Sequence, residues 1–156
     1  MVILCFNFNG MRLTSFLLYC ILMAGTGTIK AQSLDDYQWK NRILLLVDES
    51  AYTNALTSQL ATLNADKKGL AERDLLVFRV TPDAVFTSDA TMTQLNPKAL
   101  YADYDLKADF KGVVLLGKDG GVKMREPYEV KTQRIFALID GMPMRRREIR
   151  ESTPKS

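Results

Sequence analysis

Residues 42–56, RILLLVDESAYTNAL, decide how this chain is organised. The unbroken apolar run 43–47 is typical of a strand that is covered on both faces. Beyond it the apolar residues Tyr52, Leu56, Leu60 and Leu63 follow the spacing of one helix face. Ser50 is placed to cap that helix, and Lys67, Lys68 and Gly69 suit its end. A second apolar run, LLVFRV at 75–80, completes a strand–helix–strand unit, which we expect to be parallel.

The remaining segments continue the same alternation. Residues 81–95 read as an irregular stretch, and Asn96-Pro97 opens a short helix. The run 113–116, the turn GKDGG at 117–121 and alternation from Val122 predict two strands joined as a hairpin. An amphipathic helix follows, which Gly141 and Pro143 should break. The prediction is an α/β/α sandwich of three layers, with a mixed sheet of about four to five strands in the order β-α-β-α-β-β-α.

The N-terminus has the pattern of a secretory signal. Residues 13–25 form an apolar stretch after Arg12, and the small residue Ala31 suits a cleavage site. The apolar stretch is shorter than the ~20 residues that span a membrane. An uncleaved anchor is the alternative, and Met11 is a second possible start. The expected organisation is a signal peptide at 1–31, a lead-in at 32–41, a domain at 42–144 and a basic tail at 145–156.

Cysteine and histidine usage restricts the chemistry. The chain has no His, and its two cysteines, Cys5 and Cys20, both lie in the expected leader. After cleavage, thiol–disulfide exchange, Cys nucleophiles, thiolate zinc sites and a Ser-His-Asp triad would lack their essential groups. Losing the leader, which holds Arg12 and Lys30 and no acid, lowers the net charge from +3 to +1. We therefore expect no nucleic-acid partner.

The order of elements is that of the thioredoxin fold, and several segments extend the likeness. The stretch LYADYDLKADFKGVVLLGKDGGVKM resembles peroxiredoxins in its layout. The segments YQWKNRILLLV, AERDLLVFRV, LLGKDGGVKM and LIDGMPMRRREI resemble an uncharacterised family of exported bacterial thioredoxin-like domains. That family is related to the domain of the animal DUDES extracellular proteins, which include Equarin and sushi-repeat proteins.

The resemblance implies a secreted domain without an established activity. It also singles out a set of motif residues: Trp39, Arg42, Glu72, Arg73, Asp74, Gly117, Lys118, Asp119, Gly120, Lys123, Asp140, Met142, Pro143, Met144 and Arg145.

The departures from redox members of the fold are as informative. Where those members place Cys-x-x-Cys, this chain has Glu49, Ser50, Ala51, Tyr52 and Thr53. Where they place a proline before the third strand, it has Phe110-Lys111-Gly112. The resemblance therefore implies a scaffold without the redox groups.

The candidate ligand site lies after the first strand. Asp48, Glu49 and Ser50 follow it, with Thr81 expected from the neighbouring strand and Lys111 from the loop before the third. Adjacent carboxylates could bind a hard cation. Capping by Ser50, with both acids near a helix N-terminus, explains the same residues structurally and is the interpretation we favour.

Three other features have two interpretations each. Glu72, Arg73 and Asp74 form either a recognition cluster or ion pairs that fix a helix–strand connection, with Arg42 as a possible partner. The arginines of MRRREIR form either a polyanion-binding end or a solvated turn neutralised by Glu148 and Glu151, with Arg145 packing back onto the domain. Trp39 is expected to be buried over a strand end.

Taken together, we expect a secreted or periplasmic, non-catalytic binding or structural module. Its partner would be an unknown protein or glycan of the cell envelope, without a cofactor, a metal site or a membrane span after cleavage. The alternatives are a metal-assisted enzyme that uses Asp48 and Glu49, and a polyanion-binding protein that uses its basic end.

Overall fold

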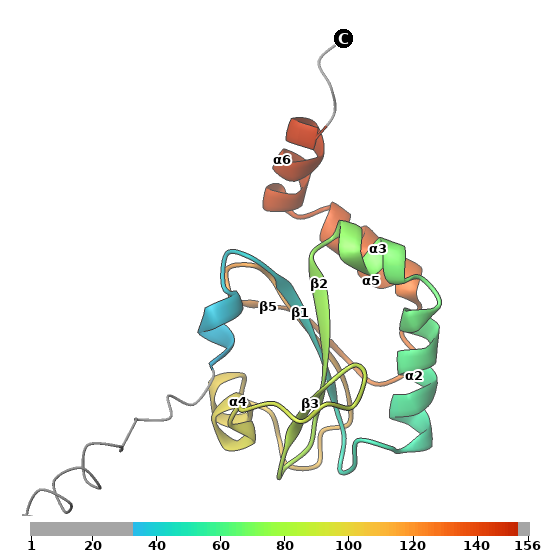
Figure 1. Cartoon of the computed structure of the whole chain (residues 1–156), viewed down its shortest axis with the longest axis vertical. Helices are drawn as coiled ribbons and strands as arrows, with labels where there is room; N and C mark the ends of the chain where they lie inside the picture. The colour runs from blue at the N-terminus through green and yellow to red at the C-terminus, as the bar shows by residue number, and fades with distance from the viewer. Residues whose placement is uncertain (1–32, 153–156) are drawn as a thin grey trace, which may run out of the picture. The chain divides into compact units, whose positions relative to one another are not determined.

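Residues 33–152 are described in a computed structural model of the chain, and they lie within one unit, residues 31–156. The predicted leader, with Cys5 and Cys20, lies outside the described residues, as do the last residues of the predicted tail. The elements are η1 (Leu34–Tyr37), β1 (Arg42–Val47), α2 (Asn54–Asn64), α3 (Lys67–Glu72), β2 (Leu75–Val80), β3 (Val85–Thr87), α4 (Pro97–Asp103), β4 (Gly112–Leu116), β5 (Val122–Glu126), α5 (Thr132–Asp140) and α6 (Pro143–Ser152) (Figure 1).

The strands form one mixed sheet of five strands in the order β3-β2-β1-β4-β5. β1 and β2 are parallel, with Leu44 opposite Val77, which confirms the predicted strand–helix–strand unit. β4 is antiparallel to β1, and β5 is antiparallel to β4 through the GKDGG turn. The Gly117 amide donates to the Gly121 carbonyl, and Gly120 has a φ of 79°, a value that favours glycine. The predicted hairpin is therefore confirmed.

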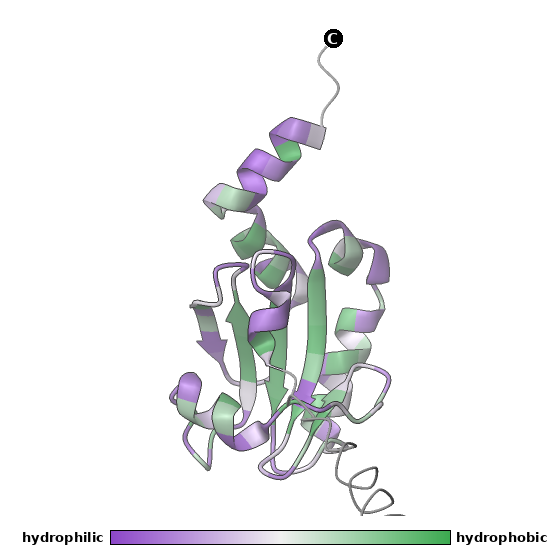
Figure 2. Ribbon diagram, turned by 60° about the vertical axis from the view of Figure 1, so that its left-hand side comes forward, coloured by the Kyte–Doolittle hydropathy of each residue, from purple (hydrophilic) through white to green (hydrophobic). Residues whose placement is uncertain are grey.

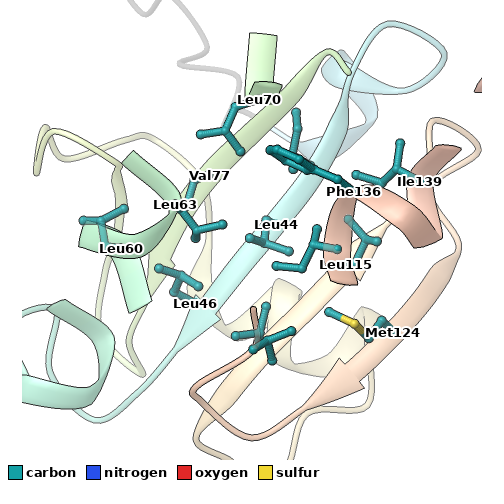
Figure 3. Close-up of a cluster of buried hydrophobic side chains, with 14 of the residues drawn as sticks. Leu44, Leu46, Leu60, Leu63, Leu70, Val77, Leu115, Met124, Phe136 and Ile139 are labelled. Carbon is teal, nitrogen blue, oxygen red and sulfur yellow. The ribbon is translucent and has the colours of Figure 1, made fainter. Parts of the chain in front are cut away.

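Helices cover both faces of the sheet, as predicted. α2, α3 and α5 pack on one face, where Leu44, Leu46 and Leu115 lie in one cluster with Leu63 and Phe136 (Figure 3). η1 and α4 pack on the other face with the alternate strand residues. Every residue of β1 is buried because both of its faces are covered. Figure 2 shows that the central strands are hydrophobic, whereas α6 is mainly hydrophilic.

The first helix begins later than predicted. Thr53, not Ser50, is its N-cap, and its hydroxyl accepts a hydrogen bond from the Leu56 amide at 3.3 Å. Ser50 accepts from the Tyr52 amide within a turn that precedes the helix. Tyr52 therefore leaves the predicted helix stripe, and 65% of its surface is exposed. The turn forms because Asp48 accepts hydrogen bonds from the Glu49 amide and the Thr53 hydroxyl.

The predicted end of that helix is also wrong. α2 ends at Asn64, and Asp66 caps α3 by accepting from the Gly69 amide at 2.8 Å. Lys67 and Lys68 thus begin a second helix, and Gly69 lies inside it. A Cβ on Gly69 would lie 2.5 Å from a ring carbon of Phe136, so α5 packs where that side chain would be. Close helix packing, and not a helix end, explains this glycine.

The irregular stretch 81–95 contains a short strand that periodicity did not reveal. β3 adds to the edge of the sheet antiparallel to β2. α4 begins as predicted, since Asn96 accepts from the amides of Lys98 and Ala99. The predicted break near Gly141 and Pro143 is confirmed, because α5 ends at Asp140 and α6 begins at Pro143. The boundary predicted between residues 144 and 145 falls inside α6. No helix in residues 33–152 has the length and apolar character needed to cross a membrane.

Candidate functional site

The carboxyl end of β1 carries the predicted site residues. Asp48 is 2% exposed, and its carboxylate accepts from the Glu49 amide at 2.8 Å and from the Thr53 hydroxyl. Lys111, in the loop before β4, donates to Glu49 at 2.7 Å. The same ammonium lies 3.9 Å from Asp48. The structure therefore brings Asp48, Glu49 and Lys111 together as one ion group.

The two carboxylates differ in their exposure to solvent. Asp48 is buried, whereas the Glu49 side chain is 70% exposed, and the Lys111 ammonium contacts both. The hydrogen bond with Glu49 raises the pKa of Lys111, which keeps the ammonium charged. Within residues 33–152 no three His, Cys, Asp or Glu side chains are grouped so that they could hold a metal ion. The arrangement thus places a lysine, with its own positive charge, between the two acids.

Thr81 and Ser50 do not join this group. The Thr81 hydroxyl donates to the Ala84 carbonyl at 2.9 Å and accepts from the Ala84 amide at 3.0 Å. Ser50 is exposed and engaged with the Tyr52 amide. Both side chains therefore stabilise turns in their own loops, where Thr81 has the geometry of a short turn motif.

Two tyrosines complete this end of the sheet and were missed in the sequence. The Tyr128 hydroxyl donates to the Val47 carbonyl at 2.8 Å. Burial raises the pKa of Tyr128, and the nearby charge of Asp48 adds to the effect. Burial and Asp48 raise the pKa of Tyr101 in the same way. No spacing in the sequence connects these tyrosines with β1, because they come from separate loops and helices.

A second group of charged residues lies at the opposite end of β1. Arg42 begins the strand and is 1% exposed. Its guanidinium donates to both oxygens of Glu148, at 3.0 and 3.2 Å, and to the Arg73 carbonyl at 2.9 Å. Lys118, from the β4–β5 turn, lies 2.8 Å from Glu148 and 2.8 Å from Asp74. Glu148 therefore links α6 to the start of β1 and to the hairpin.

The same group extends to the α5–α6 junction. Arg73 pairs with Asp140 at 2.6 Å and stacks over the Phe136 ring at 4.2 Å. Arg145 lies 3.4 Å from both Asp140 and Glu148, so it packs back onto the domain. Glu72, Arg73 and Asp74 all take part in ion pairs, which is what one of their two interpretations predicts. Arg42 contributes to this group through the Arg73 carbonyl and Glu148.

The electrostatics of Glu148 follow from these contacts. Burial alone raises its pKa, but hydrogen bonds from Arg42 and Lys118 outweigh burial and lower the pKa from 4.5 to about 2. The carboxylate thus stays ionised over the whole neutral and mildly acidic range. Glu148 was considered in the sequence only as a neutralising charge. Its role depends on a contact with Arg42 across 106 positions of the chain.

Trp39 is exposed, which contradicts the predicted burial. Its exposed fraction is 63%. Tyr37 takes the place that was predicted for Trp39 and packs edge to face on Phe78, with 5.6 Å between the ring centres. Trp39 instead adopts a φ of 65°, and its amide donates to the Lys118 carbonyl at 2.7 Å. A bulky residue seldom adopts this backbone region.

A cavity of about 290 Å³ lies beside this second group. It is partly open to solvent and is lined by the β4–β5 turn, the start of β1 and the α5–α6 junction. Its lining residues are Arg42, Gly117, Lys118, Asp119, Lys123, Met142, Pro143 and Met144. All eight were among the motif residues that the sequence resemblance singled out, and the fold collects them from three separate segments.

Comparison with protein families decides the chain's membership. Residues 33–148 match the family model described as a domain of unknown function, DUF4174. The chain belongs to this family. The match of the DUF4174 domain includes Glu148 and the first half of α6. No curated protein matches the chain.

Among solved structures, the DUF4174 domain is similar to a reduced 2-Cys peroxiredoxin from Plasmodium vivax. The TM-score is 0.54 with 16% sequence identity, over 74% of this chain and 84% of the peroxiredoxin. At this identity the likeness concerns the fold. The predicted thioredoxin-like architecture is therefore confirmed, and the structure gives it a sheet of five strands.

Proposed function

We propose that this DUF4174 domain is an exported thioredoxin-like module that binds a protein or glycan partner in the cell envelope and performs no thiol chemistry. One observation carries the proposal. The carboxyl end of β1, where redox members of the fold have their cysteines, holds Asp48 hydrogen-bonded to Thr53 and in contact with Lys111. These groups satisfy one another, so this end of the sheet acts as a structural junction.

The sequence around that junction supports the same conclusion. Phe110-Lys111-Gly112 takes the place of the substrate-aligning proline. Cleavage after Ala31 would remove Cys5 and Cys20 and leave a chain without a thiol. A nucleophilic thiolate, which exchange and peroxide reduction both require, would then be missing.

A binding role is supported by the large apolar side chains on the surface. Trp39, Tyr52 and Met92 are each more than 60% exposed. Tyr and Trp are the residues that most often anchor interfaces, because they bury a large rigid area at low entropic cost. Tyr52 also lies under the guanidinium of Arg79, 5.8 Å from its ring centre, which restricts its position.

Export and absence of thiol chemistry can be tested together. The chain is expressed in a bacterial host with an outer membrane, and the envelope fraction is examined by intact mass and assayed for insulin disulfide reduction and peroxide consumption. We expect a product that begins at Gln32, with rates equal to those of a buffer control. Retention of Cys20 together with either activity would overturn the proposal. A Cys5→Ser/Cys20→Ser chain is the control for residual thiol.

The two alternatives have less support. A metal-assisted reaction would need Asp48 and Glu49 to share a cation, but the Lys111 ammonium contacts both. Polyanion binding would use α6, where Arg145 is already paired with Asp140 and Glu148. Arg146, Arg147 and Arg150 remain exposed. Retention on heparin that is lost when residues 145–156 are deleted would favour this second alternative.

A further inference from the structure

We propose that the free part of the β2 edge binds an extended segment of a partner protein, which adds to the sheet as a further strand. The inference rests on the proposed function as a binding module, and it names the surface and the class of partner. β3 pairs only with Phe78–Val80. Leu75–Val77 therefore have no neighbouring strand on their outer side within residues 33–152.

The pairing of β2 with β1 shows which backbone groups are available at this edge. The carbonyls of Asp74 and Val80 accept hydrogen bonds from amides at the two ends of the β1 segment, at 2.8 and 3.0 Å. Because backbone groups alternate in direction along a strand, Leu75 and Val77 direct theirs away from β1. Within residues 33–152 no group on that side accepts from the amides of these two residues. Such amides are free to pair with another strand.

A groove of about 520 Å³ lies along the same edge. Tyr37, Leu76 and Phe78 line it on the sheet face that η1 and α4 cover. Leu70 and Val77 line it on the face that α2 and α3 cover. Successive side chains of a strand point to opposite faces of a sheet, so an added strand would place side chains in both parts of the groove. The position of the groove on both faces therefore matches an added strand.

The opposite edge of the sheet has features that oppose such pairing. β5 carries Lys123, Arg125 and Glu126, and its register with β4 shifts at one position. Charged side chains and irregular register are common ways in which proteins keep an edge strand from pairing with another chain. Leu75–Val77 carry no charge and are paired in a regular register with β1. Of the two edges, this part of β2 is the one suited to an additional strand.

The side chains beside the groove indicate the sequence of the partner segment. Leu76 and Phe78 offer an apolar surface on one face, where we expect apolar residues of the segment. On the other face Lys67 is exposed and forms no ion pair within residues 33–152. The nearby Asp89 is already hydrogen-bonded to the Thr87 hydroxyl. The segment that we expect therefore alternates apolar residues with polar ones that include an acid.

A second copy of the chain fits this edge less well. In an antiparallel pair, β3 of the second copy would lie on the same side as the free edge. It would then meet Arg73 and Asp74, which directly precede that edge and are held by ion pairs with Asp140 and Lys118. A single extended segment has no such neighbour. Addition of one strand to a sheet edge is also an established mode of peptide recognition.

The test uses the peptide acetyl-Thr-Val-Glu-Val-Thr-amide, whose valines lie on one face of a strand and whose glutamate lies on the other. Two further peptides carry N-methyl groups, one on both valines and the other on the glutamate and the last threonine. Adjacent amides of a strand point to opposite edges, so only one of these two peptides loses hydrogen bonds to β2. Binding to the purified chain is measured by calorimetry, and amide hydrogen exchange is followed by NMR.

We expect the unmodified peptide to bind and, at saturation, to slow exchange of the Leu75 and Val77 amides by at least about tenfold, with no change in β5. One N-methylated peptide should bind at least about tenfold more weakly, and the other within about twofold of the unmodified peptide. Lys67→Gln should weaken binding by about threefold, as expected for an exposed ion pair. Lys68→Gln, which changes a neighbouring exposed lysine outside the groove, is the matched control and should leave binding unchanged.

Several results would overturn the proposal. Equal weakening by the two N-methylated peptides would show contact through side chains alone. No binding of the unmodified peptide, unchanged exchange at Leu75 and Val77, or equal effects of Lys67→Gln and Lys68→Gln would each contradict the added strand. A dimer in sedimentation that protects the same amides without peptide would assign the edge to a second copy instead. None of these results would affect the proposed function, which is judged by export and thiol assays.

Discussion

At the scale of single residues, Glu148 does most to attach α6 to the sheet. It accepts from Arg42, which is 1% exposed, and from Lys118. Glu148→Gln should lower the free energy of unfolding by about 3 kcal/mol at pH 7, because the buried guanidinium loses its counter-charge. Urea denaturation measures the change. Glu151→Gln, exposed on the same helix, is the control and should change stability by less than ~0.5 kcal/mol.

The same contact predicts a pH dependence. The pKa of Glu148 is lowered to about 2 in the folded chain, against an ordinary value of 4.5. Its contribution is therefore complete above pH 4.5 and is lost as the pH falls toward 2. The stability difference between the unmodified chain and Glu148→Gln should shrink over this interval. A difference that stays constant down to pH 2 would show that the ion pair is not its source.

A comparison of two hydroxyls tests the start of α2. Thr53 caps the helix and donates to the buried Asp48, whereas Ser50 contacts only the Tyr52 amide. Thr53→Ala should cost about 1–2 kcal/mol of stability, because the cap and the partner of Asp48 are lost together. Ser50→Ala should lower the free energy of unfolding by less than ~0.5 kcal/mol. Thermal unfolding of both variants measures the two losses of stability. A larger loss for Ser50→Ala than for Thr53→Ala would contradict the observed cap.

At the scale of elements, β4 begins at a glycine that has no room for a side chain. A Cβ on Gly112 would lie 2.2 Å from the Glu126 carbonyl oxygen and 2.9 Å from the Pro127 Cα. These are backbone atoms of the last residue of β5 and of the residue after it, so Gly112→Ala should destabilise the chain by several kcal/mol, on the order of 3 or more. Gly141→Ala is the matched variant, with helical φ and no atom closer than 3.4 Å. It should leave the melting temperature unchanged or raise it.

The C-terminal boundary of the domain depends on whether α6 contributes to the stability of the fold. A domain that ended at residue 144 would lose Glu148 and leave Arg42 and Lys118 without their shared carboxylate. A chain truncated after residue 144 should therefore be at least as unstable as Glu148→Gln, by about 3 kcal/mol or more. Truncation after residue 152 should preserve stability, because all contacts of α6 described above remain. Equal stability of the two truncations would place the boundary at residue 144.

At the scale of the whole molecule, metal binding has a simple signature. A ligand that binds only the folded state raises the free energy of unfolding, and with it the melting temperature, by an amount that grows with the logarithm of the ratio of its concentration to its Kd. Calcium or magnesium at about a hundred times a micromolar Kd would stabilise a folded site by about 2.7 kcal/mol. We expect no shift, because Lys111 contacts both Asp48 and Glu49. A rise that Asp48→Asn abolishes would restore the metal-assisted alternative.

The architecture was predictable because it depends on patterns local to each segment. Apolar runs such as 43–47 identify buried strands, and GKDGG identifies a hairpin, whatever surrounds them. β3 was not predicted because a strand of three residues is too short to show a periodic apolar pattern. It is stabilised by pairing with β2. Gly69 was misplaced because Phe136, from a distant helix, determines why a glycine is required there.

The site was less predictable, for the same physical reason. Asp48, Glu49 and Lys111 could be named from the sequence, because strand ends in this fold meet at one edge. Trp39 was placed wrongly, since local pattern cannot tell which of two aromatic residues, Tyr37 or Trp39, covers a strand end. The partners of Arg42 come from β2's preceding loop and from α6. Only the folded chain brings such segments together.

By itself the sequence determined the layers, the hairpin and the positions of the cysteines, because residue type and spacing act over a few positions. The tertiary structure alone decided which charges pair, where Trp39 lies and that a cavity forms beside Arg42. Electrostatic and packing energies depend on distances in space, and segments as far apart as Arg42 and Glu148 acquire those distances only through folding.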